Sequence, residues 1–261
     1  MSQQSEVVLS IDRVAVHFGG LIAISDMTFS VRKGEIVGLI GPNGAGKTTA
    51  FNVVTGFLKP TSGEVRYRTT SLNGLKPHEI ANLGLLRTFQ RTSVFTERDV
   101  FQNVLTALHL QGRAKLWDTL LRTPREVSSE SEMADQAREI LRFVGLETRA
   151  DERAGTLPYG EQRLLGVALA LAGKPTMLLL DEPVSGMNPS ETARFVQLVK
   201  KIRDTGVTIL LVEHDMPMVM GVCDRIVVLN YGKIIAEGTP AEIQNNREVI
   251  SAYLGEGKKR A

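Results

Sequence analysis

The sequence predicts an α/β fold, because short apolar runs alternate with segments of helical periodicity. The run Met177–Leu180 is short enough to be a buried parallel strand, and acidic residues follow it directly. The run Glu35–Ile40 also indicates a buried strand, and a glycine-rich loop and a helical segment follow it. Since ligands bind at the carboxyl ends of strands in open α/β sheets, we expect the functional residues there.

The glycine-rich loop fits the phosphate-binding pattern G-x-x-x-x-G-K-[ST]. It consists of Gly41, Pro42, Asn43, Gly44, Ala45, Gly46, Lys47, Thr48 and Thr49. Its glycines allow a tight turn that points backbone N–H groups inward, and the following helix, predicted from Thr48 to Thr55, adds its positive end. We expect Lys47 to reach the β- and γ-phosphates of a nucleotide and Thr48 to ligate Mg²⁺. A plain turn with a surface lysine is the alternative, and the order strand, loop, helix disfavours it.

Two strands are predicted before the loop, Val7–Phe18 and Ala23–Val31, which pair back across Phe18-Gly19-Gly20. Phe18 could stack on an adenine ring or be a core aromatic at a strand end, and the spacing does not separate these readings. The later segment Leu85–Gln90 is predicted to be a strand. Its last residue, Gln90, could orient a water and contact Mg²⁺, or could be a surface glutamine.

From about Arg91 the pattern becomes helical, with one helix predicted over Val100–Leu110 and another over Ser129–Val144. Ser129 with Glu132 forms the pattern of a capping box for the second helix, and Gly145 is a natural stop. The segment Gln111–Ser128 is interpreted as a variable excursion whose function cannot be deduced. Further helices are predicted after Leu157–Gln162 up to Ala172, over Ser190–Arg203 and from Thr239 onward. A strand is predicted over Val207–Val212, and a hairpin is predicted from Ile226–Leu229 and Lys233–Ala236.

Three residues at predicted strand ends could carry chemistry. Asp181 is placed to hold Mg²⁺ through a water, opposite Thr48. Glu182 is a candidate general base for an attacking water, although adjacent carboxylates can also be a solvated loop. His214 could hydrogen-bond a γ-phosphate, yet a single histidine is more often structural or on the surface.

Composition restricts the function classes. The 261 residues are 43% hydrophobic and 23% charged, and 31 basic against 29 acidic residues give a net charge of +2, too small for a nucleic-acid footprint. Cys223 is the only cysteine, so no internal disulfide can form. The sequence shows no apolar signal-peptide core and no apolar run near the ~20 residues of a membrane span. We expect a soluble, cytosolic protein whose membrane role comes through a partner.

Taken together, the phosphate loop, Gln90, Leu157–Gln162, Asp181-Glu182 and His214 resemble the ATP-binding subunits of ABC transporters over essentially the whole chain. Within that family the sequence is most similar to the ATPases of branched-chain amino-acid importers. The supporting stretches are Asn52–Gly56, Arg87–Gln90, Gly186–Pro189 and Ala252–Glu256.

The resemblance implies a single ABC ATPase domain over residues 1–261 with a P-loop NTPase (RecA-like) core. Residues 1–90 and 174–261 would form this core, with an N-terminal antiparallel β subdomain and a C-terminal helical extension. Residues 91–173 would form an inserted α-helical signature subdomain. The expected cofactors are ATP and Mg²⁺, and the expected location is the cytoplasmic face of the inner membrane.

The resemblance also assigns roles. Phe18 would stack on adenine, Gln90 would sense the membrane partner, Glu182 would be the catalytic base and His214 the switch residue. A signature loop would cap the ATP held by an opposite subunit, so that two copies or paralogues sandwich two nucleotides head to tail; it comprises Leu157, Pro158, Tyr159, Gly160 and Glu161. Further expected partners are transmembrane permease subunits and, indirectly, a periplasmic solute-binding protein.

Some residues depart from the family pattern. Pro158 replaces the usual serine and lacks both its hydroxyl and the backbone N–H, so weakened closure over ATP is expected. Leu169 stands where arginine is usual, and Asn188 replaces a common aspartate. The alternatives are an ATPase of lipid or lipopolysaccharide export, a soluble ABC ATPase acting on DNA or ribosomes, and a scaffold that hydrolyses little. The last of these is kept open by Pro158.

Overall fold

The computed structural model describes residues 6–88, 94–111 and 124–257, and the chain divides into two compact units. We call the first the core unit, made of Met1–Arg87, Thr176–Ser185 and Thr192–Ala261. The second, the helical unit, is made of Thr88–Pro175 and Gly186–Glu191. The domain boundaries expected from the sequence, at residues 91 and 174, stay a prediction.

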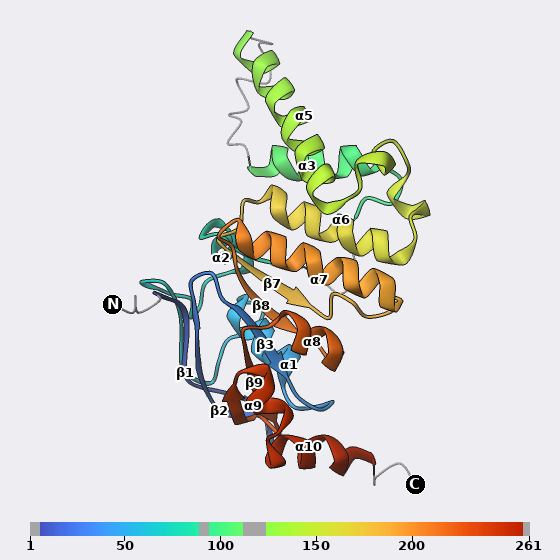
Figure 1. Cartoon of the computed structure of the whole chain (residues 1–261). Coiled ribbons are helices and arrows are strands. Elements are labelled where there is room, and N and C mark those ends of the chain that lie inside the picture. Colours follow the sequence, from blue (N-terminus) through green and yellow to red (C-terminus); the bar gives the residue numbers. More distant parts are fainter. Residues whose placement is uncertain (1–5, 89–93, 112–123, 258–261) are drawn as a thin grey trace, which may run out of the picture. The chain divides into compact units, whose positions relative to one another are not determined.

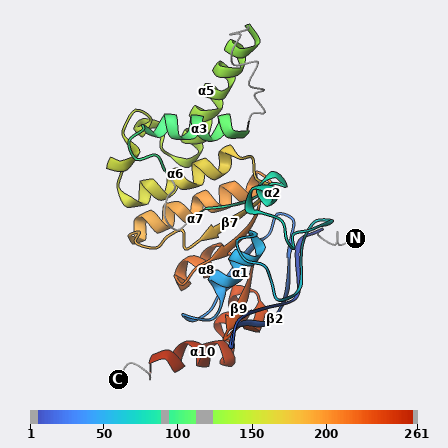
Figure 2. The same cartoon turned by 180° about the vertical axis from the view of Figure 1, so that it is seen from behind.

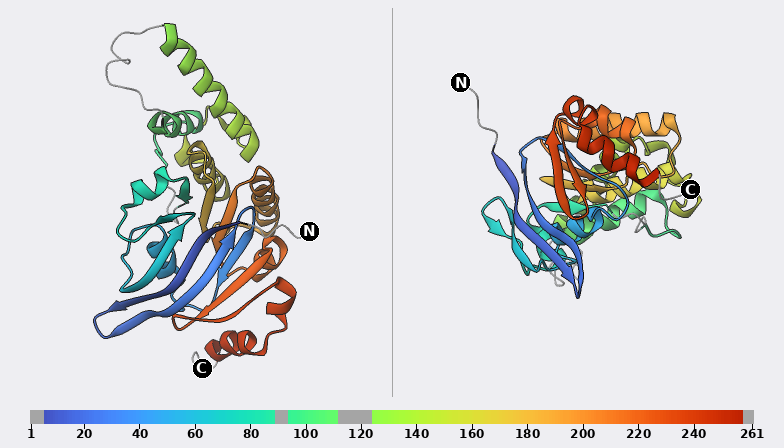
Figure 3. Two further views of the ribbon diagram at one scale, coloured as in Figure 1. Left: turned by 90° about the vertical axis from the view of Figure 1, so that its left-hand side faces the viewer. Right: turned by 90° about the horizontal axis from the view of Figure 1, so that it is seen from below.

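The described residues of the core unit build one ten-stranded sheet in the order β5-β4-β1-β2-β10-β9-β3-β8-β7-β6. The strands are β1 (Val7–Phe18), β2 (Leu21–Arg32), β3 (Ile36–Ile40), β4 (Ser62–Tyr67), β5 (Thr70–Ser71), β6 (Leu85–Arg87), β7 (Met177–Asp181), β8 (Thr208–Val212), β9 (Arg225–Asn230) and β10 (Lys233–Gly238). Strands β9, β3, β8, β7 and β6 run parallel, whereas β1 pairs antiparallel with both β2 and β4. Figure 3 shows how the long β1–β2 hairpin continues the curve of the sheet. The predicted α/β class is therefore confirmed.

The central strands β3, β7 and β8 are apolar except for Asp181 and Thr208 at their ends. Every residue of β3, β7 and β8 is buried, as expected for parallel strands in the interior of a sheet. The helices of the core unit are α1 (Lys47–Val54), α2 (Pro77–Asn82), α8 (Met216–Val222), α9 (Pro240–Gln244), α10 (Arg247–Gly257) and most of α7 (Pro189–Asp204). Their positions around the sheet can be followed in Figure 1.

In the part of the helical unit that the structure describes, three helices pack against one another: α3 (Val100–Gln111), α5 (Pro124–Val144) and α6 (Tyr159–Ala172). Short 3₁₀ turns at Glu147–Arg149 and Ala154–Thr156 connect α5 to α6. Figure 2 shows α3 crossing α5. Ala137, Leu141 and Val144 of α5 are buried at spacings of four and three residues, which confirms the helical period predicted for this segment.

The predicted start of α5 is wrong. The helix begins at Pro124, not at Ser129, so Ser129 lies inside the helix and cannot be its N-cap. Proline at the first helical position is itself a start signal, and here it is the correct one. The predicted stop at Gly145 is confirmed, since Gly145 has the left-handed φ of 82° that favours glycine.

The predicted hairpin and the predicted start of a helix at Thr239 are also confirmed. Tyr231 and Gly232, with φ of 43° and 74°, join β9 to β10 as a hairpin. Thr239 caps α9 in a capping box: Thr239 Oγ1 accepts from the N–H of Glu242, whose carboxylate accepts from the N–H of Thr239 at 2.7 Å. The hydrogen bonds that the Glu242 carboxylate accepts from the N–H and the hydroxyl of Thr239 hold the pKa of Glu242 below its usual value.

A mostly buried ion pair links β9, β2 and β10 to the residue before β3. Arg225, on β9, donates to both carboxylate oxygens of Glu35 at 2.7 and 2.9 Å, and to the carbonyl of Ser30 at 2.6 Å. It also pairs with Glu237 on β10. Burial on its own would raise the pKa of Glu35, but the hydrogen bonds from Arg225 and from the N–H of Arg32, with the charges of both arginines, lower the pKa below its usual value.

We predict that Arg225→Met lowers the free energy of unfolding by about 2 kcal/mol at pH 7, because Glu35 keeps its charge and loses its partner. A lowered pKa stabilises the fold above the unfolded pKa of Glu35, and this contribution is lost as pH falls through the folded pKa. The difference between wild type and variant should therefore shrink between about pH 5 and pH 3 in urea unfolding.

Arg203→Met is the matched control, since Arg203 pairs with the more exposed Asp204 and Asp224. It should leave the unfolding free energy nearly unchanged. Equal losses in the two variants would contradict a special contribution of the Arg225–Glu35 pair.

Candidate functional site

The phosphate loop joins β3 to α1 and needs glycine for steric reasons. A Cβ atom on Gly41 would lie 2.0 Å from the carbonyl oxygen of Leu229, and one on Gly46 would lie 2.8 Å from that of Ala23. Gly41 and Gly46 also have φ of 154° and 107°, which side-chain-bearing residues rarely adopt. The loop is thus pressed against β9 and β2 on one side, while Asn43, Gly44 and Thr48 are exposed on the other.

The side chain of Lys47 folds back onto the start of the phosphate loop. Its Nζ donates to the carbonyls of Gly41 at 2.6 Å and Pro42 at 2.9 Å, and the residue is only 8% exposed. The first helical hydrogen bond of α1 runs from Ala50 N to Gly46 O, and no acidic residue lies in the first turn. An ammonium group and a helix N-terminus therefore meet at this loop, which is the charge arrangement that binds an anion.

Asp181 ends β7 and is 4% exposed. Its carboxylate accepts a hydrogen bond from Nη2 of Arg87 at 2.6 Å. Arg87 lies on the neighbouring strand β6, where it pairs in register with Leu179. Sequence reasoning missed Arg87, although a charged residue at the end of a strand beside the Asp181 strand was a signal that could have identified it.

Glu182 has a left-handed backbone, with φ of 44°, and its N–H donates to the carbonyl of Val212 at 2.9 Å. A residue other than glycine costs on the order of 1–3 kcal/mol in such a conformation. It persists only where neighbouring contacts impose it. Such strain is common at active sites, so it draws attention to Glu182 independently of the sequence motif.

Glu213 supplies one of those contacts and was also missed. It is fully buried, and its Oε1 accepts from the N–H of Val184 at 3.0 Å. Its Oε2 accepts from the N–H groups of His214 at 2.9 Å and Asp215 at 3.2 Å. One carboxylate therefore fixes both the turn that contains Glu182 and the segment that contains His214, whose own side chain is 59% exposed. An acidic residue directly after an apolar strand was the available signal.

The sheet register brings these groups to one edge. Val212 of β8 pairs with Leu39 of β3 and with Asp181 of β7, so the phosphate loop, Asp181-Glu182 and Glu213-His214 leave the sheet side by side. Thr48 and Asp181 offer the hard oxygen ligands that Mg²⁺ prefers. Among the described residues no cluster of three or more His, Cys, Asp or Glu could hold a metal. Two protein oxygens together with phosphate oxygens nevertheless fit a Mg²⁺ ion.

Phe18 lies at the end of β1 and is 50% exposed. The interpretation as a core aromatic is therefore wrong. Leu21 and Ile22, on the other side of the hairpin turn, are exposed as well. The tip of the hairpin thus presents an aromatic face that a planar ligand could stack on.

The five signature-loop residues lie in the helical unit, where α6 begins. Pro158 is the N-cap of α6 and makes no side-chain cap, while Leu157 and Gly160 are buried. Tyr159 is 47% exposed, and its hydroxyl pairs with Arg163. Glu161 forms an ion pair with Arg149 at 3.2 Å. A Cβ atom on Gly160 would lie 3.0 Å from the carboxylate of Glu191, so this turn leaves little room for a side chain.

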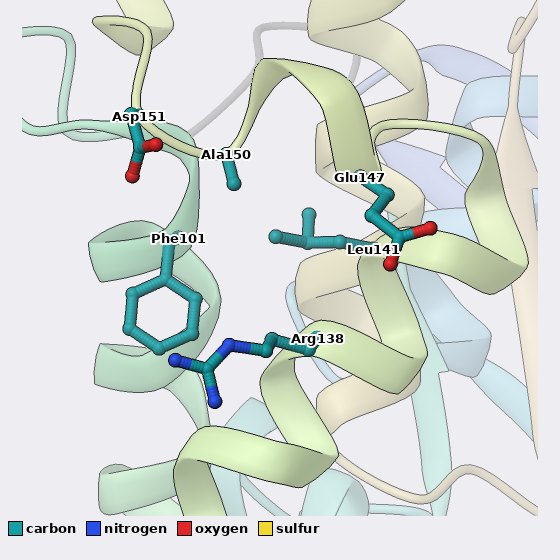
Figure 4. Close-up of a pocket in the computed structure, with 6 residues that line it drawn as sticks. All are labelled: Phe101, Arg138, Leu141, Glu147, Ala150 and Asp151. Atoms are coloured by element: carbon teal, nitrogen blue, oxygen red, sulfur yellow. The ribbon is translucent and has the colours of Figure 1, made fainter.

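A hollow of about 410 Å³ opens elsewhere in the helical unit. Its lining consists of Phe101, Arg138, Leu141, Glu147, Ala150 and Asp151 (Figure 4). The guanidinium of Arg138 lies 5.5 Å from the centre of the Phe101 ring. None of the residues predicted for the site belongs to this hollow.

Gln90 lies outside the described residues, so its predicted role stays a prediction. Within the ranges that the structure describes, no helix is both long and apolar enough to cross a membrane.

Comparisons with known proteins agree with this geometry. Residues 24–185 match the family model described as ABC transporter, and residues 233–259 match that of branched-chain amino acid ATP-binding cassette transporters. The high-affinity branched-chain amino acid transport ATP-binding protein LivG of Salmonella typhimurium is 46% identical over 97% of this chain and 99% of its own.

Solved structures are similar over nearly the same extent. An ATP-binding cassette of an ABC transporter in its ADP conformation superimposes with a TM-score of 0.84 at 31% identity, covering 96% of this chain and 100% of that one. A cassette solved as a dimer in a post-hydrolysis state with ADP and Pi gives a TM-score of 0.74 at 25% identity, covering 89% and 98%. The chain thus belongs to the ABC transporter family, as an ATP-binding subunit that acts as a transport-coupled ATPase.

Proposed function

We propose that this chain binds and hydrolyses MgATP to drive the import of branched-chain amino acids through separate permease subunits. The observation that carries the proposal is the convergence of the phosphate loop, Asp181-Glu182 and His214 at one edge of the sheet. The solute class is supported by the similarity to LivG, a high-affinity branched-chain amino acid transport ATP-binding protein, and by the family match at residues 233–259.

The proposed chemistry follows from the positions of these groups. The loop amides, the N-terminus of α1 and Lys47 bind the phosphates, and Phe18 stacks on the adenine. Thr48 and Asp181, with Gln90, would hold Mg²⁺, which would supply positive charge to neutralise the phosphate oxygens. Glu182 takes a proton from the attacking water, and His214 contacts the γ-phosphate. Glu213 acts through these two residues by fixing their backbone.

The remaining residues act on a second ATPase subunit. The signature residues Leu157, Pro158, Tyr159, Gly160 and Glu161 would cap the ATP held by an opposite subunit, identical or paralogous, in a head-to-tail dimer. The similar cassette that was solved as a dimer with ADP and Pi supports the association of two such subunits. Closing on ATP and reopening after hydrolysis would move the permease subunits.

The cell context is proposed on the same basis. The chain would lie at the cytoplasmic face of the inner membrane, attached to its permease and served by a periplasmic solute-binding protein. Export of lipid or lipopolysaccharide is the second candidate, and the family match at residues 233–259 favours import over it. A weakly hydrolysing nucleotide switch is the third, favoured only by Pro158.

The first test separates binding from chemistry. In the transporter reconstituted with its permease, Glu182→Gln should bind MgATP normally and lose about 10²–10⁴-fold in ATP hydrolysis, because the general base is gone. Lys47→Ala should lose MgATP binding. Phosphate release measures ATP hydrolysis, a nucleotide-binding assay measures the affinity for MgATP, and uptake of labelled leucine measures transport.

Glu132→Gln is the control, since Glu132 is an exposed carboxylate on α5. It should behave as wild type in all three assays. If Lys47→Ala bound MgATP as tightly as wild type and still supported uptake, the proposed function would be refuted.

We further predict that Glu213→Gln slows hydrolysis by about tenfold while the affinity for MgATP stays within about twofold. The side-chain amide nitrogen cannot accept, so one of the N–H groups of Val184, His214 or Asp215 faces a donor. Hydrogen exchange of these three amides should accelerate together with the fall in kcat.

Glu79→Gln is the matched control, because the Glu79 carboxylate also accepts a backbone N–H, from Lys76 at 2.7 Å, but on α2. It should leave kcat unchanged. A slower kcat without faster exchange at Val184 and His214 would show that Glu213 does not act by fixing the backbone.

Pro158 generates a further prediction. Pro158→Ser supplies a hydroxyl and an N–H at the start of α6, so closure over the opposite ATP should tighten and hydrolysis in the assembled transporter should accelerate. Pro158→Ala restores the N–H alone and should have the smaller effect. ATP affinity and turnover that are the same in all three proteins would rule out a brake at Pro158.

A further inference from the structure

Arg87 is enclosed by groups from three parts of the core unit. Its Nη2 donates to Asp181 at 2.6 Å, and its Nη1 donates to Asn52 Oδ1 at 2.8 Å and to Thr55 Oγ1 at 3.2 Å. Asn52 and Thr55 belong to α1 and to its C-cap, and so to the helix that carries the phosphate loop. The guanidinium is therefore built into the site and is not a mobile surface charge.

Aromatic faces complete this enclosure. The guanidinium carbon lies 5.7 Å from the ring centre of Phe51 and 5.9 Å from that of Phe57, within the range of a cation–π interaction. The Arg87 side chain is 10% exposed and that of Asp181 4%, so solvent screens the pair only weakly. A charge–charge contact of this kind is strong, and it fixes the rotamers of both residues.

This contact changes what Asp181 can offer to a cation. A carboxylate that is buried beside a guanidinium forms a nearly neutral pair, and a divalent cation that approaches it is repelled by the arginine. A metal that arrives with nucleotide phosphates brings its own negative charge, and these phosphates also contact Lys47 and the N-terminus of α1. The electrostatic balance therefore favours the metal–nucleotide complex over the metal alone.

We propose that Arg87 is a positioning residue that supplies Asp181 with a resident positive charge, so that a divalent cation binds at Asp181 only together with nucleotide phosphates. The proposal rests on the proposed function, in which Asp181 faces Mg²⁺. It adds that the metal site stays closed to free cation until nucleotide binds.

The test measures metal binding to the purified full-length chain without nucleotide, with Mn²⁺ as the probe and electron paramagnetic resonance as the readout. Arg87→Gln keeps a hydrogen-bond donor and removes the charge, and Arg87→Met removes both. Both variants should bind Mn²⁺ at least about tenfold more tightly than wild type, because Asp181 then carries an uncompensated charge. Arg87→Lys, which keeps the charge, should resemble wild type.

Two controls identify the site. Asp181→Asn in the Arg87→Gln background should remove the gain, as a double-mutant cycle requires for a direct pair. Arg225→Met also breaks an arginine–carboxylate pair, the mostly buried one with Glu35, but Arg225 lies on β9, which β3 and β8 separate from β7, and this variant should not tighten Mn²⁺ binding. If Arg87 only stabilises the fold, its variants will melt at lower temperature and bind Mn²⁺ as wild type does, which overturns the proposal.

Asp181→Asn alone provides a test that does not need an Arg87 variant to fold. If the Arg87–Asp181 pair is closed to free cation, this variant and wild type should bind Mn²⁺ equally weakly without nucleotide. A clear loss of Mn²⁺ binding in Asp181→Asn would overturn the proposal. None of these measurements involves hydrolysis or uptake, so their failure is distinct from failure of the proposed function.

Discussion

The arrangement of the core unit depends on a buried negative charge at the end of a strand. Asp181 is buried at the end of β7, next to the terminal strand β6, where a carboxylate is costly unless a positive group compensates it. Arg87, from the adjacent strand, provides this compensation and at the same time reaches α1. The strand, its neighbour and the helix after the phosphate loop are therefore held together by one guanidinium.

A second buried carboxylate, that of Glu213, is stabilised by backbone N–H groups instead of by an ion pair. Glu213 accepts three N–H groups, from Val184, His214 and Asp215, so its charge is spread over amides that would otherwise lack partners at the end of the sheet. The left-handed Glu182 lies in the turn that this carboxylate fixes. The strain at Glu182 and the burial of Glu213 are thus parts of one arrangement that presents a carboxylate at the carboxyl edge.

The sequence was sufficient where a local pattern determines the structure. The phosphate loop follows from glycine spacing, the strands from apolar runs, and the start of α9 from Thr239-Pro240 with Glu242. The same capping pattern failed at Ser129, because Ser-x-x-Glu also occurs inside helices and Pro124 had already started α5. For Phe18 the sequence left two readings, since strand alternation does not say how far a hairpin extends beyond its neighbours.

The partners of Arg87 and Glu213 could not be predicted from the sequence, because these contacts are not local. Arg87 meets Asp181 across 94 positions and Glu213 meets Val184 across 29, so each contact exists only once the sheet order is known. The residues that a motif identifies are those proposed to contact the ligand, whereas the residues that hold them in place are selected by the register of β6, β7 and β8. In this fold the local sequence identifies the candidate chemical groups, whereas the ion pair and hydrogen bonds that hold them become apparent only from the order of the strands in the sheet.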